Sequence, residues 1–316
     1  MLRIVLAAIA IIAPRQAWAT APASAEIISQ SLSSVVSVLP EWPPDKRRKE
    51  EPEGSGVIVG DGLFIATAAH IVSKARSIRI RTFDGNLLNA KLVGLDRATD
   101  IALLRIDRVL RPLPIDTRDP AIGERVCAIG NAFGLGLSVT CGVVSAVNKA
   151  GVGFNVIEDF VQTDAAVNPG ASGGALVSGT GKMVGLLSAI FTKRSDANIG
   201  VNFAVSPVLV SRVIAMLRDA GRAKWTSSGL RLVAAPRKGD VGRLGAKVVR
   251  VAEESVAARA GFVVNDVILR AGGRRIRKPA DFTSVFARYG PRTTIEVMIF
   301  RDGGNRNLIL KNDERR

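Results

Sequence analysis

The chain has 316 residues, 47% of them apolar and 23% charged, and its formal net charge is +16. This size and composition are typical of two soluble domains that each bury a core, and they exclude a chain that is disordered over most of its length. The two cysteines are too few for a disulfide-stapled scaffold, and neither has a metal-ligand spacing.

The N-terminal residues have the pattern of an export signal. Arg3 provides a positive start, residues 4–13 form an apolar run, and residues 17–19 (AWA) offer a cleavage site between small residues. The apolar run is too short for a membrane-spanning helix, which needs roughly 20 residues. We therefore predict a signal peptide over residues 1–19, with cleavage after residue 25 or an uncleaved anchor as the alternatives.

The rest of the chain divides into an arm and two domains. Residues 54–205 contain many short apolar runs separated by Gly, Asn and Asp-Gly, which favours an all-β barrel or sandwich over βαβ units. Ser206 as N-cap and Pro207 as first helical residue then predict one amphipathic helix that ends at Gly221. The predicted organisation is an N-terminal arm and charged loop (26–53), a mainly β domain (54–221), a linker (222–228) and a second, α/β domain (229–312).

His70 is the only histidine of the chain and directly follows the apolar run LFIATAA. Histidine is the usual general base near neutral pH, although a lone histidine is more often structural. Asp100 begins DIALLRI, where a carboxylate is costly to bury unless it hydrogen-bonds a partner. The imidazole of His70 is the expected partner, and Asp96 is the alternative acid.

Ser172 lies in the glycine-rich segment NPGASGG, which is expected to form a turn between two strands. Such a turn exposes the serine hydroxyl and aims backbone N–H groups at one point. Fixed donors of this kind stabilise the oxyanion of acyl transfer by roughly 3 kcal/mol each. The expected donors are the N–H groups of Gly170 and Ser172.

These segments together resemble a known family. TAAH, DIALL and GxSGG match trypsin-like serine proteases, and TDAAVNPGASGG with AIGNAFGLG is similar to the HtrA/Deg family of envelope proteases. The resemblance implies a trypsin-like double six-stranded β-barrel with Ser172 as nucleophile, His70 as general base and Asp100 orienting the imidazole. It implies no metal or organic cofactor. Ala171 and Ala175 replace the family's usual Asn and Pro, which affects how firmly the oxyanion loop is ordered.

The same resemblance suggests a substrate preference. The position that carries a carboxylate in trypsin-like enzymes of basic specificity is Ala166 here, six residues before Ser172, so cleavage after Lys or Arg is not expected. We predict a specificity pocket lined by Ala166, Val167 and Asn202 that accepts small or medium aliphatic residues. The alternative is that these residues only fill the core.

The second domain resembles the PDZ domain of this family, with KPADFTSVFARYG as the groove helix. Such domains bind C-terminal peptides by adding a strand to a sheet edge and by capturing the terminal carboxylate with backbone N–H groups. The carboxylate-binding loop is expected at Ser228, Gly229 and Leu230. Polar Ser227 and Ser228 depart from the family pattern and leave the ligand preference open. A closed β domain that only docks on the protease is the alternative.

By resemblance, the chain is a periplasmic endopeptidase for unfolded or damaged proteins and a homotrimer assembled through the arm. A proteolytically silent PDZ adaptor is the alternative. From Gly229 onward there are 19 basic and 9 acidic residues, which indicates either a tether to an anionic surface or merely a solvated basic face. The aromatic content of 5% argues against specific recognition of nucleic acid.

Cys127 and Cys141 lie on two predicted strands on either side of the NAFGLG segment. A disulfide between them and two buried thiols are equally compatible with the sequence. Export from the cytoplasm would permit the bond.

Overall fold

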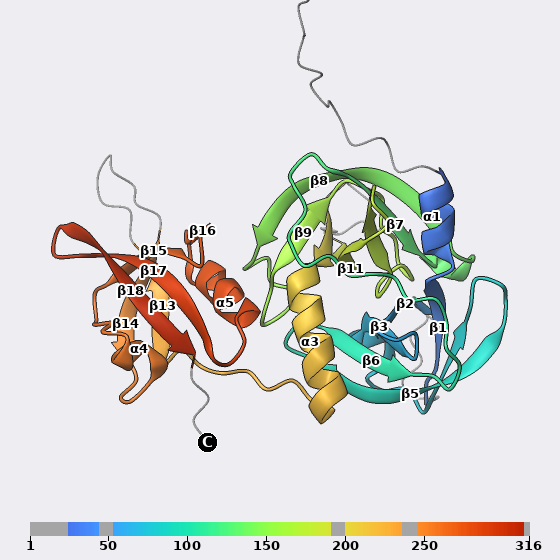
Figure 1. The fold of residues 1–316 in the computed structure, drawn as a ribbon, viewed down its shortest axis with the longest axis horizontal. Coiled ribbons are helices and arrows are strands. Elements are labelled where there is room, and N and C mark those ends of the chain that lie inside the picture. The colour runs from blue at the N-terminus through green and yellow to red at the C-terminus, as the bar shows by residue number, and fades with distance from the viewer. Residues whose placement is uncertain (1–24, 44–52, 191–199, 236–244, 313–316) are drawn as a thin grey trace, which may run out of the picture.

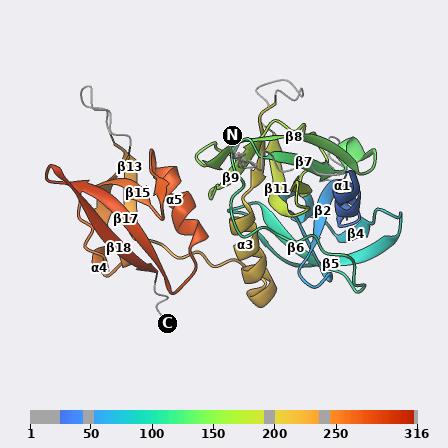
Figure 2. The same cartoon turned by 45° about the horizontal axis from the view of Figure 1, so that its top comes forward.

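The computed structural model describes residues 25–43, 53–190, 200–235 and 245–312. The predicted signal peptide and nearly all of the charged loop lie outside these residues. Figures 1 and 2 show a double barrel beside a separate C-terminal domain, and both parts are mainly β. The predicted fold class is confirmed. Over the described ranges, no helix combines the length and apolar character that crossing a bilayer requires.

The first barrel is closed by six antiparallel strands in the order β1-β2-β3-β6-β5-β4. The sequence patterns fit their places: in β4, Ile78 and Ile80 are buried while Ser77 and Arg79 are exposed. Gly85, with a φ of +85°, lies in the turn between β4 and β5. The six strands are β1 (Val35–Glu41), β2 (Gly54–Val59), β3 (Phe64–Ala68), β4 (Ser77–Arg81), β5 (Leu87–Asp96) and β6 (Ile101–Arg105).

β1 belongs to the segment that the sequence suggests is an arm. It pairs with both β2 and β4, so the barrel begins at Val35 rather than at Gly54. The physical reason is closure, because β2 and β4 would otherwise be edges with unpaired backbone groups. The short helix α1 (Ala25–Leu32) precedes this strand.

The second barrel is closed in the order β10-β11-β12-β9-β8-β7. Cys127 and Cys141 are directly opposite each other on β7 and β8 and form a disulfide, which decides between the two alternatives left by the sequence. The six strands are β7 (Arg125–Gly130), β8 (Ser138–Lys149), β9 (Phe160–Thr163), β10 (Ala175–Ser178), β11 (Met183–Ile190) and β12 (Asn202–Val205).

Helix α3 (Pro207–Ala220) packs against both barrels and follows its sequence signals closely. The Ser206 side chain accepts a hydrogen bond from the Leu209 N–H, and Gly221 ends the helix in the left-handed conformation. Its apolar face joins a core that includes Phe64 of the first barrel and Phe160 of the second. The candidate site residues described below lie where these barrels meet.

The C-terminal domain is a sheet in the order β13-β14-β15-β17-β18, with β16 paired to β15. Helices α4 (Val256–Arg259) and α5 (Pro279–Arg288) cover its core, which includes Val248, Ile268 and Phe282. Figure 1 shows α5 on the side that faces α3. The strands are β13 (Leu230–Ala234), β14 (Ala246–Val251), β15 (Val267–Ala271), β16 (Arg274–Arg275), β17 (Thr293–Arg301) and β18 (Gly304–Asn312).

Candidate active site

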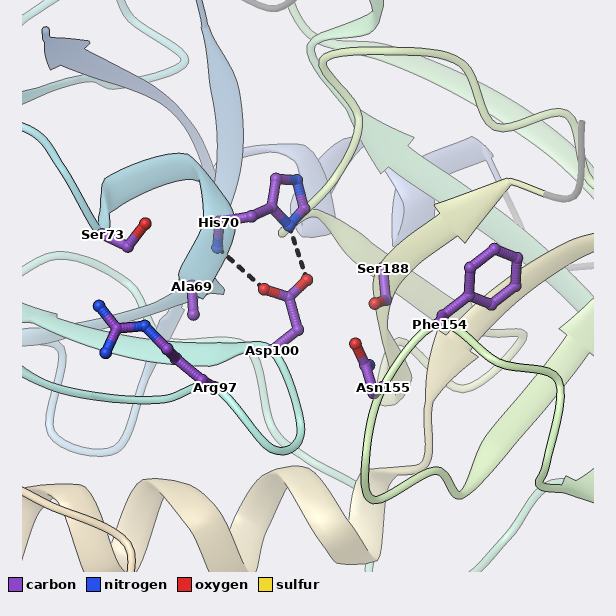
Figure 3. Close-up of a pocket in the computed structure, with 8 residues that line it drawn as sticks. All are labelled: Ala69, His70, Ser73, Arg97, Asp100, Phe154, Asn155 and Ser188. Carbon is purple, nitrogen blue, oxygen red and sulfur yellow. Dashed lines mark hydrogen bonds and ion pairs between the residues drawn. The ribbon is translucent and has the colours of Figure 1, made fainter. Parts of the chain in front are cut away.

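Asp100 holds His70 in two places. His70 lies on the short helix α2 (Ala69–Val72), which directly follows β3, and Asp100 directly precedes β6. Because Ala68 of β3 pairs with Ile101 of β6, the two residues meet at the same barrel end. One carboxylate oxygen lies 2.6 Å from the His70 Nδ1, and the other accepts from the His70 backbone N–H at 2.8 Å (Figure 3).

This arrangement sets the orientation of the imidazole. An ionised carboxylate only accepts hydrogen bonds, so the Nδ1 of His70 carries the proton that it donates to Asp100. The other ring nitrogen, Nε2, is then the basic atom on the far side of the ring. Asp100 itself has a φ of 60°, a conformation that few residues other than glycine adopt, and its carbonyl oxygen accepts from the Ala69 N–H.

Asp96, the alternative acid, forms its hydrogen bonds with Thr99 and Trp225. It is buried, and its carboxylate accepts from the Thr99 N–H and hydroxyl at 3.2 and 2.6 Å. Its other oxygen accepts from the Trp225 indole N–H at 3.2 Å. Asp96 therefore stabilises the turn before Asp100, and Asp100 is the acid in contact with the histidine.

The loop that carries Ser172 packs against the strand that leads to His70. A side chain at Gly173 would collide with the Ser55 carbonyl oxygen and would lie 2.9 Å from the Ala68 backbone nitrogen. The Ser172 carbonyl accepts from the Ser55 N–H at 2.9 Å. The Ser172 hydroxyl, in a residue that is 8% exposed, donates to the Ser188 carbonyl at 3.4 Å, which is a long hydrogen bond.

The backbone N–H groups of Gly170 and Ser172 differ from the other two in this loop. The Ala171 N–H donates to Asn168 and the Gly173 N–H to Leu187. In the described part of the chain, by contrast, no hydrogen bond is formed by the N–H groups of Gly170 and Ser172. These are the two donors that the sequence singles out for an oxyanion hole, and they are available to a bound group.

A cavity of about 390 Å³ opens beside His70 and Asp100. The sequence did not single out Phe154, Asn155 or Ser188, which line it, because they lie far from the motifs along the chain. Asn155 donates to the Thr99 carbonyl at 3.2 Å, so this loop is tied to the turn before Asp100. The cavity is lined by Ala69, His70, Ser73, Arg97, Asp100, Phe154, Asn155 and Ser188 (Figure 3).

Glu158 shapes the loop that lines this cavity. Its buried carboxylate accepts hydrogen bonds from four successive backbone N–H groups, residues 152–155, at 2.6 to 3.1 Å. The ring of Phe154 also contacts Phe160 and Phe203, with centroids 6.4 and 5.8 Å away. The loop therefore has a defined shape without regular secondary structure.

The predicted pocket residues lie apart from this cavity. Ala166 is exposed and its carbonyl accepts from the Thr140 hydroxyl at 2.5 Å. Val167 is buried among core residues of the second barrel. Asn202 is fully buried and donates to the Ala165 carbonyl at 2.9 Å. None of the three is among the residues that line the cavity.

The predicted peptide-binding residues lie at the start of β13, which among the described strands pairs only with β14. The carbonyls of Ser228 and Gly229 accept from the N–H groups of Ala257 and Ala252. The N–H groups of Gly229 and Leu230 donate to the hydroxyls of Ser227 and Ser228 at 3.1 and 3.3 Å. The donors expected to capture a carboxylate are thus occupied by serine side chains, which can rotate away.

A cluster of charges joins the two domains, and no motif in the sequence indicates it. Asp159, directly before β9, is completely buried and contacts Arg274 at 2.7 Å and Arg288 at 2.5 Å. Asp119 contacts the same two arginines at 2.6 and 2.9 Å. Burial alone would raise the pKa of Asp159, but the two guanidinium charges outweigh it and lower that pKa.

A second cross-domain contact is made by Arg212 of α3. Its guanidinium donates to the carbonyls of Ala287 and Tyr289 at the C-terminal end of α5. It also stacks over the Trp225 ring, 5.2 Å from the centroid. Burial lowers the pKa of Arg212.

Comparison with known proteins agrees with this architecture. Residues 54–186 match the trypsin-like peptidase domain, and residues 213–311 match the PDZ domain. Among curated proteins, the chain is 35% identical over 271 residues to the periplasmic serine endoprotease DegP of Escherichia coli K12, covering 82% of this chain and 56% of that protein. It is 32% identical to the periplasmic pH-dependent serine endoprotease DegQ of the same organism, covering 83% and 60%. The chain thus spans about half the length of the curated relatives it matches.

Solved structures match over more of their length. The HtrA-type protease AlgW with a tripeptide has a TM-score of 0.71 and 30% identity, covering 92% of this chain and 97% of that one. A serine endoprotease from Yersinia pestis has a TM-score of 0.60 and 32% identity, covering 92% and 97%. The chain therefore belongs to the HtrA/Deg family, with a trypsin-like peptidase domain followed by a PDZ domain.

Proposed function

We propose that this protein is a serine endopeptidase that hydrolyses peptide bonds through an acyl-enzyme at Ser172. One observation carries the proposal: the Asp100 carboxylate hydrogen-bonds both the ring and the backbone N–H of His70, directly after β3. The Ser172 loop packs against that strand. Nucleophilic acyl transfer needs a serine hydroxyl, a histidine that accepts its proton, and a carboxylate that orients the histidine ring.

The reaction proceeds in two halves. His70 Nε2 takes the Ser172 hydroxyl proton as Oγ attacks the scissile carbonyl carbon, and the proton then passes to the leaving amine as the C–N bond breaks. A water molecule next gives a proton to His70 and attacks the acyl carbon. The bond from that carbon to Ser172 Oγ then breaks, the carboxylic acid product leaves, and the proton returns from His70 to Oγ. The resting bond from Ser172 to Ser188 is long at 3.4 Å, so exchanging it for His70 costs little.

The N–H groups of Gly170 and Ser172 would stabilise the negative oxygen that forms in each half. Two observations support this role. The carbonyls around these N–H groups are anchored by hydrogen bonds, and neither N–H group has a partner in the described chain. Preorganised donors are worth more than mobile ones because they need no reorientation during the reaction.

We expect the substrates to be unfolded or damaged proteins in the periplasm, because the relatives are named periplasmic endoproteases. Cleavage should follow small or medium aliphatic residues. Ala166 stands where trypsin-like enzymes that cleave after Lys or Arg carry a carboxylate, so this chain has no negative charge there to bind a basic side chain. We also expect a homotrimer built through the N-terminal segment, which light scattering of the mature protein would test.

The PDZ domain is proposed to bind C-terminal peptides along the open edge of β13, with the Gly229 and Leu230 N–H groups receiving the carboxylate. Fluorescence titration with peptides that differ only in a free or amidated C terminus tests this. Equal affinity for the two peptides would contradict carboxylate capture.

A surface tether is a second candidate role for the same domain. Arg231 and Arg250 lie directly opposite each other on β13 and β14, and both are exposed. Like charges in this position destabilise a sheet, so an anionic partner would relieve them. Sedimentation with anionic vesicles at rising salt is the test, since tethering weakens steeply with salt and groove binding does not.

The proteolytic function is tested with an unfolded substrate such as reduced casein. The mature protein and Ser172→Ala are compared, and the cleavage sites are mapped by mass spectrometry. Cleavage that the substitution abolishes supports the proposal. A native protein that cleaves nothing, even with C-terminal peptides added, would shift the function to a silent PDZ adaptor.

A further inference from the structure

Ser55 connects the first barrel to the nucleophile loop of the second. It is the second residue of β2 and is completely buried. Its hydroxyl donates to the Gly170 carbonyl at 2.8 Å, although the two residues are 115 positions apart in sequence. Its backbone N–H donates to the Ser172 carbonyl at 2.9 Å. One residue thus holds the carbonyls on both sides of Ala171.

These anchors determine where the loop's N–H groups point. In a trans peptide the C=O and N–H bonds point in opposite directions, so fixing a carbonyl also fixes the next N–H. Four successive carbonyls are held, and Ser55 holds two of them, those of Gly170 and Ser172. These two carbonyls belong to the peptide groups on either side of the one that carries the Ser172 N–H, so Ser55 fixes the neighbours of that peptide group. Their donors are the Phe133 N–H for Pro169 (2.7 Å), the Ser55 hydroxyl for Gly170, the Gly174 N–H for Ala171 (2.9 Å) and the Ser55 N–H for Ser172.

Asn131 fixes the direction of the Ser55 hydroxyl. Its backbone N–H donates to the Ser55 Oγ at 2.8 Å, so the single hydroxyl proton is left to point at Gly170. Asn131 is completely buried, and its Nδ2 donates to a Glu53 carboxylate oxygen at 2.6 Å. That oxygen also accepts from Arg81 at 2.9 Å. The chain of contacts therefore runs from a charged pair to the nucleophile loop.

The packing leaves little freedom for this loop to shift. A side chain at Gly130 would lie 2.9 Å from the Ala171 Cα and 3.0 Å from the Ser55 Oγ. Gly170 has a φ of +92°, and a side chain there would collide with the Asn131 carbonyl oxygen. The loop and residues 130–136 approach each other through backbone atoms, so the loop has little room to move as a whole. Losing one of the hydrogen bonds to its carbonyls would therefore allow a peptide group to rotate.

We propose that Ser55 is a positioning residue: by fixing the peptide groups next to those that carry the Gly170 and Ser172 N–H groups, it keeps these two donors aimed at the oxyanion. Glu53, through Asn131, keeps the Ser55 hydroxyl in its donating orientation. The inference rests on the proposed peptidase function. It assigns Ser55 no contact with the substrate, so its effect should appear in the transition state and not in substrate binding.

The test compares Ser55→Ala and Glu53→Gln with the control Ser178→Ala. Ser178 is also buried and its hydroxyl pairs with Thr180, but it does not touch the nucleophile loop. For each variant, kcat and KM are measured on one peptide substrate, with the Ki of a matching peptide boronate, whose tetrahedral adduct carries an oxyanion. Unfolding midpoints are recorded in parallel.

For Ser55→Ala we expect kcat to fall about 10- to 100-fold, boronate Ki to weaken by a similar factor, and KM to change less than about 2-fold, as for loss of an aligned oxyanion donor. For Glu53→Gln, which keeps the shape but weakens a charge-assisted bond, we expect a fall of about 3-fold. Ser178→Ala should lose stability and keep kcat.

The outcomes are separable. Folded variants with unchanged kcat and boronate Ki overturn the inference, as does an equal loss in Ser178→Ala. If Ser55→Ala does not fold, Glu53→Gln decides, because its carboxylate is 24% exposed and its loss is better tolerated. An unmodified protein that neither cleaves peptides nor reacts with a fluorophosphonate at Ser172 overturns the proposed function, and this inference with it.

Discussion

Asp159 of the double barrel and Arg288 of the PDZ domain form an ion pair at 2.5 Å across the domain boundary. The Asp159 side chain is 0% exposed, and that of Arg288 is 12% exposed. Arg274 and the hydroxyls of Ser206 and Ser284 complete the contacts of this carboxylate. The docking of the two domains therefore depends on a charge that is removed from solvent.

Asp159→Asn should weaken this docking. The amide keeps the shape but leaves Asp119, which is partly exposed, as the only acidic partner of Arg274 and Arg288 among the described residues. Removing one partner of a buried ion pair costs about 3–5 kcal/mol, and Asp119 should reduce this to about 2–3 kcal/mol in the free energy of unfolding. Urea unfolding measures the difference. Asp302→Asn, which alters an exposed pair at 3.4 Å, should leave the midpoint in place. An unchanged midpoint for Asp159→Asn would show that the cluster adds no net stability.

The same residue predicts a sensitivity to acid. The pKa of Asp159 in the folded protein is lowered from its ordinary value of 3.8, since two guanidinium charges outweigh the effect of burial. A carboxyl group with a lowered pKa stabilises the fold above its unfolded-state pKa and loses that contribution as the pH falls through the folded-state pKa. We expect the free energy of unfolding to decline below about pH 4, and less steeply in Asp159→Asn. Parallel slopes for the two proteins would contradict this assignment.

Asp100→Asn should abolish most of the activity and little of the fold. The amide would favour the wrong imidazole tautomer, and such a change lowers kcat by about 10⁴-fold in a protease with this triad. Asp96→Asn is the control, since Asp96 binds Thr99 and Trp225 instead of His70. It should cost about 1–3 kcal/mol of stability for the buried bonds it disturbs, and it should lower kcat far less than Asp100→Asn does. Equal kcat losses in the two variants would point to a structural role for both acids.

Gly173→Ala should damage the nucleophile loop, since the new Cβ would strike Ser55 and lie 2.9 Å from the Ala68 nitrogen. Gly303→Ala is the matched control, because it has the same φ of +83° with no atom within 4 Å of the new Cβ. The control should therefore show only the backbone strain of about 1–2 kcal/mol. Thermal unfolding and cleavage assays should separate the two variants. Similar losses would mean that strain, not the close contact, governs this position.

Breaking the Cys127–Cys141 disulfide should lower stability. The bond closes a loop with a sequence separation of 14, for which the chain-entropy estimate is about 3 kcal/mol. The double Ser variant should therefore unfold at lower urea concentration than the oxidised protein. Reduced wild-type protein should behave like the variant, and oxidised and reduced wild type with the same midpoint would contradict the expectation.

Features with a local cause were predictable from the sequence. Helix α3 begins and ends where Ser206, Pro207 and Gly221 predict, because caps act within one helical turn. The mainly β fold class follows from short apolar runs and turn residues. The motifs around His70, Asp100 and Ser172 predicted a catalytic role that awaits the tests above, and they did so through resemblance to a family.

Tertiary structure alone decided the features that depend on distant contacts. β1 closes the first barrel because β2 and β4 both need a partner, although its segment resembled an arm. Cys127 and Cys141 form a disulfide because the register places them opposite each other. Asp159 meets Arg288 across 129 positions, and Ser55 meets Gly170 across 115. No local pattern encodes such pairs, since a buried carboxylate or hydroxyl finds its partner only when the chain has folded.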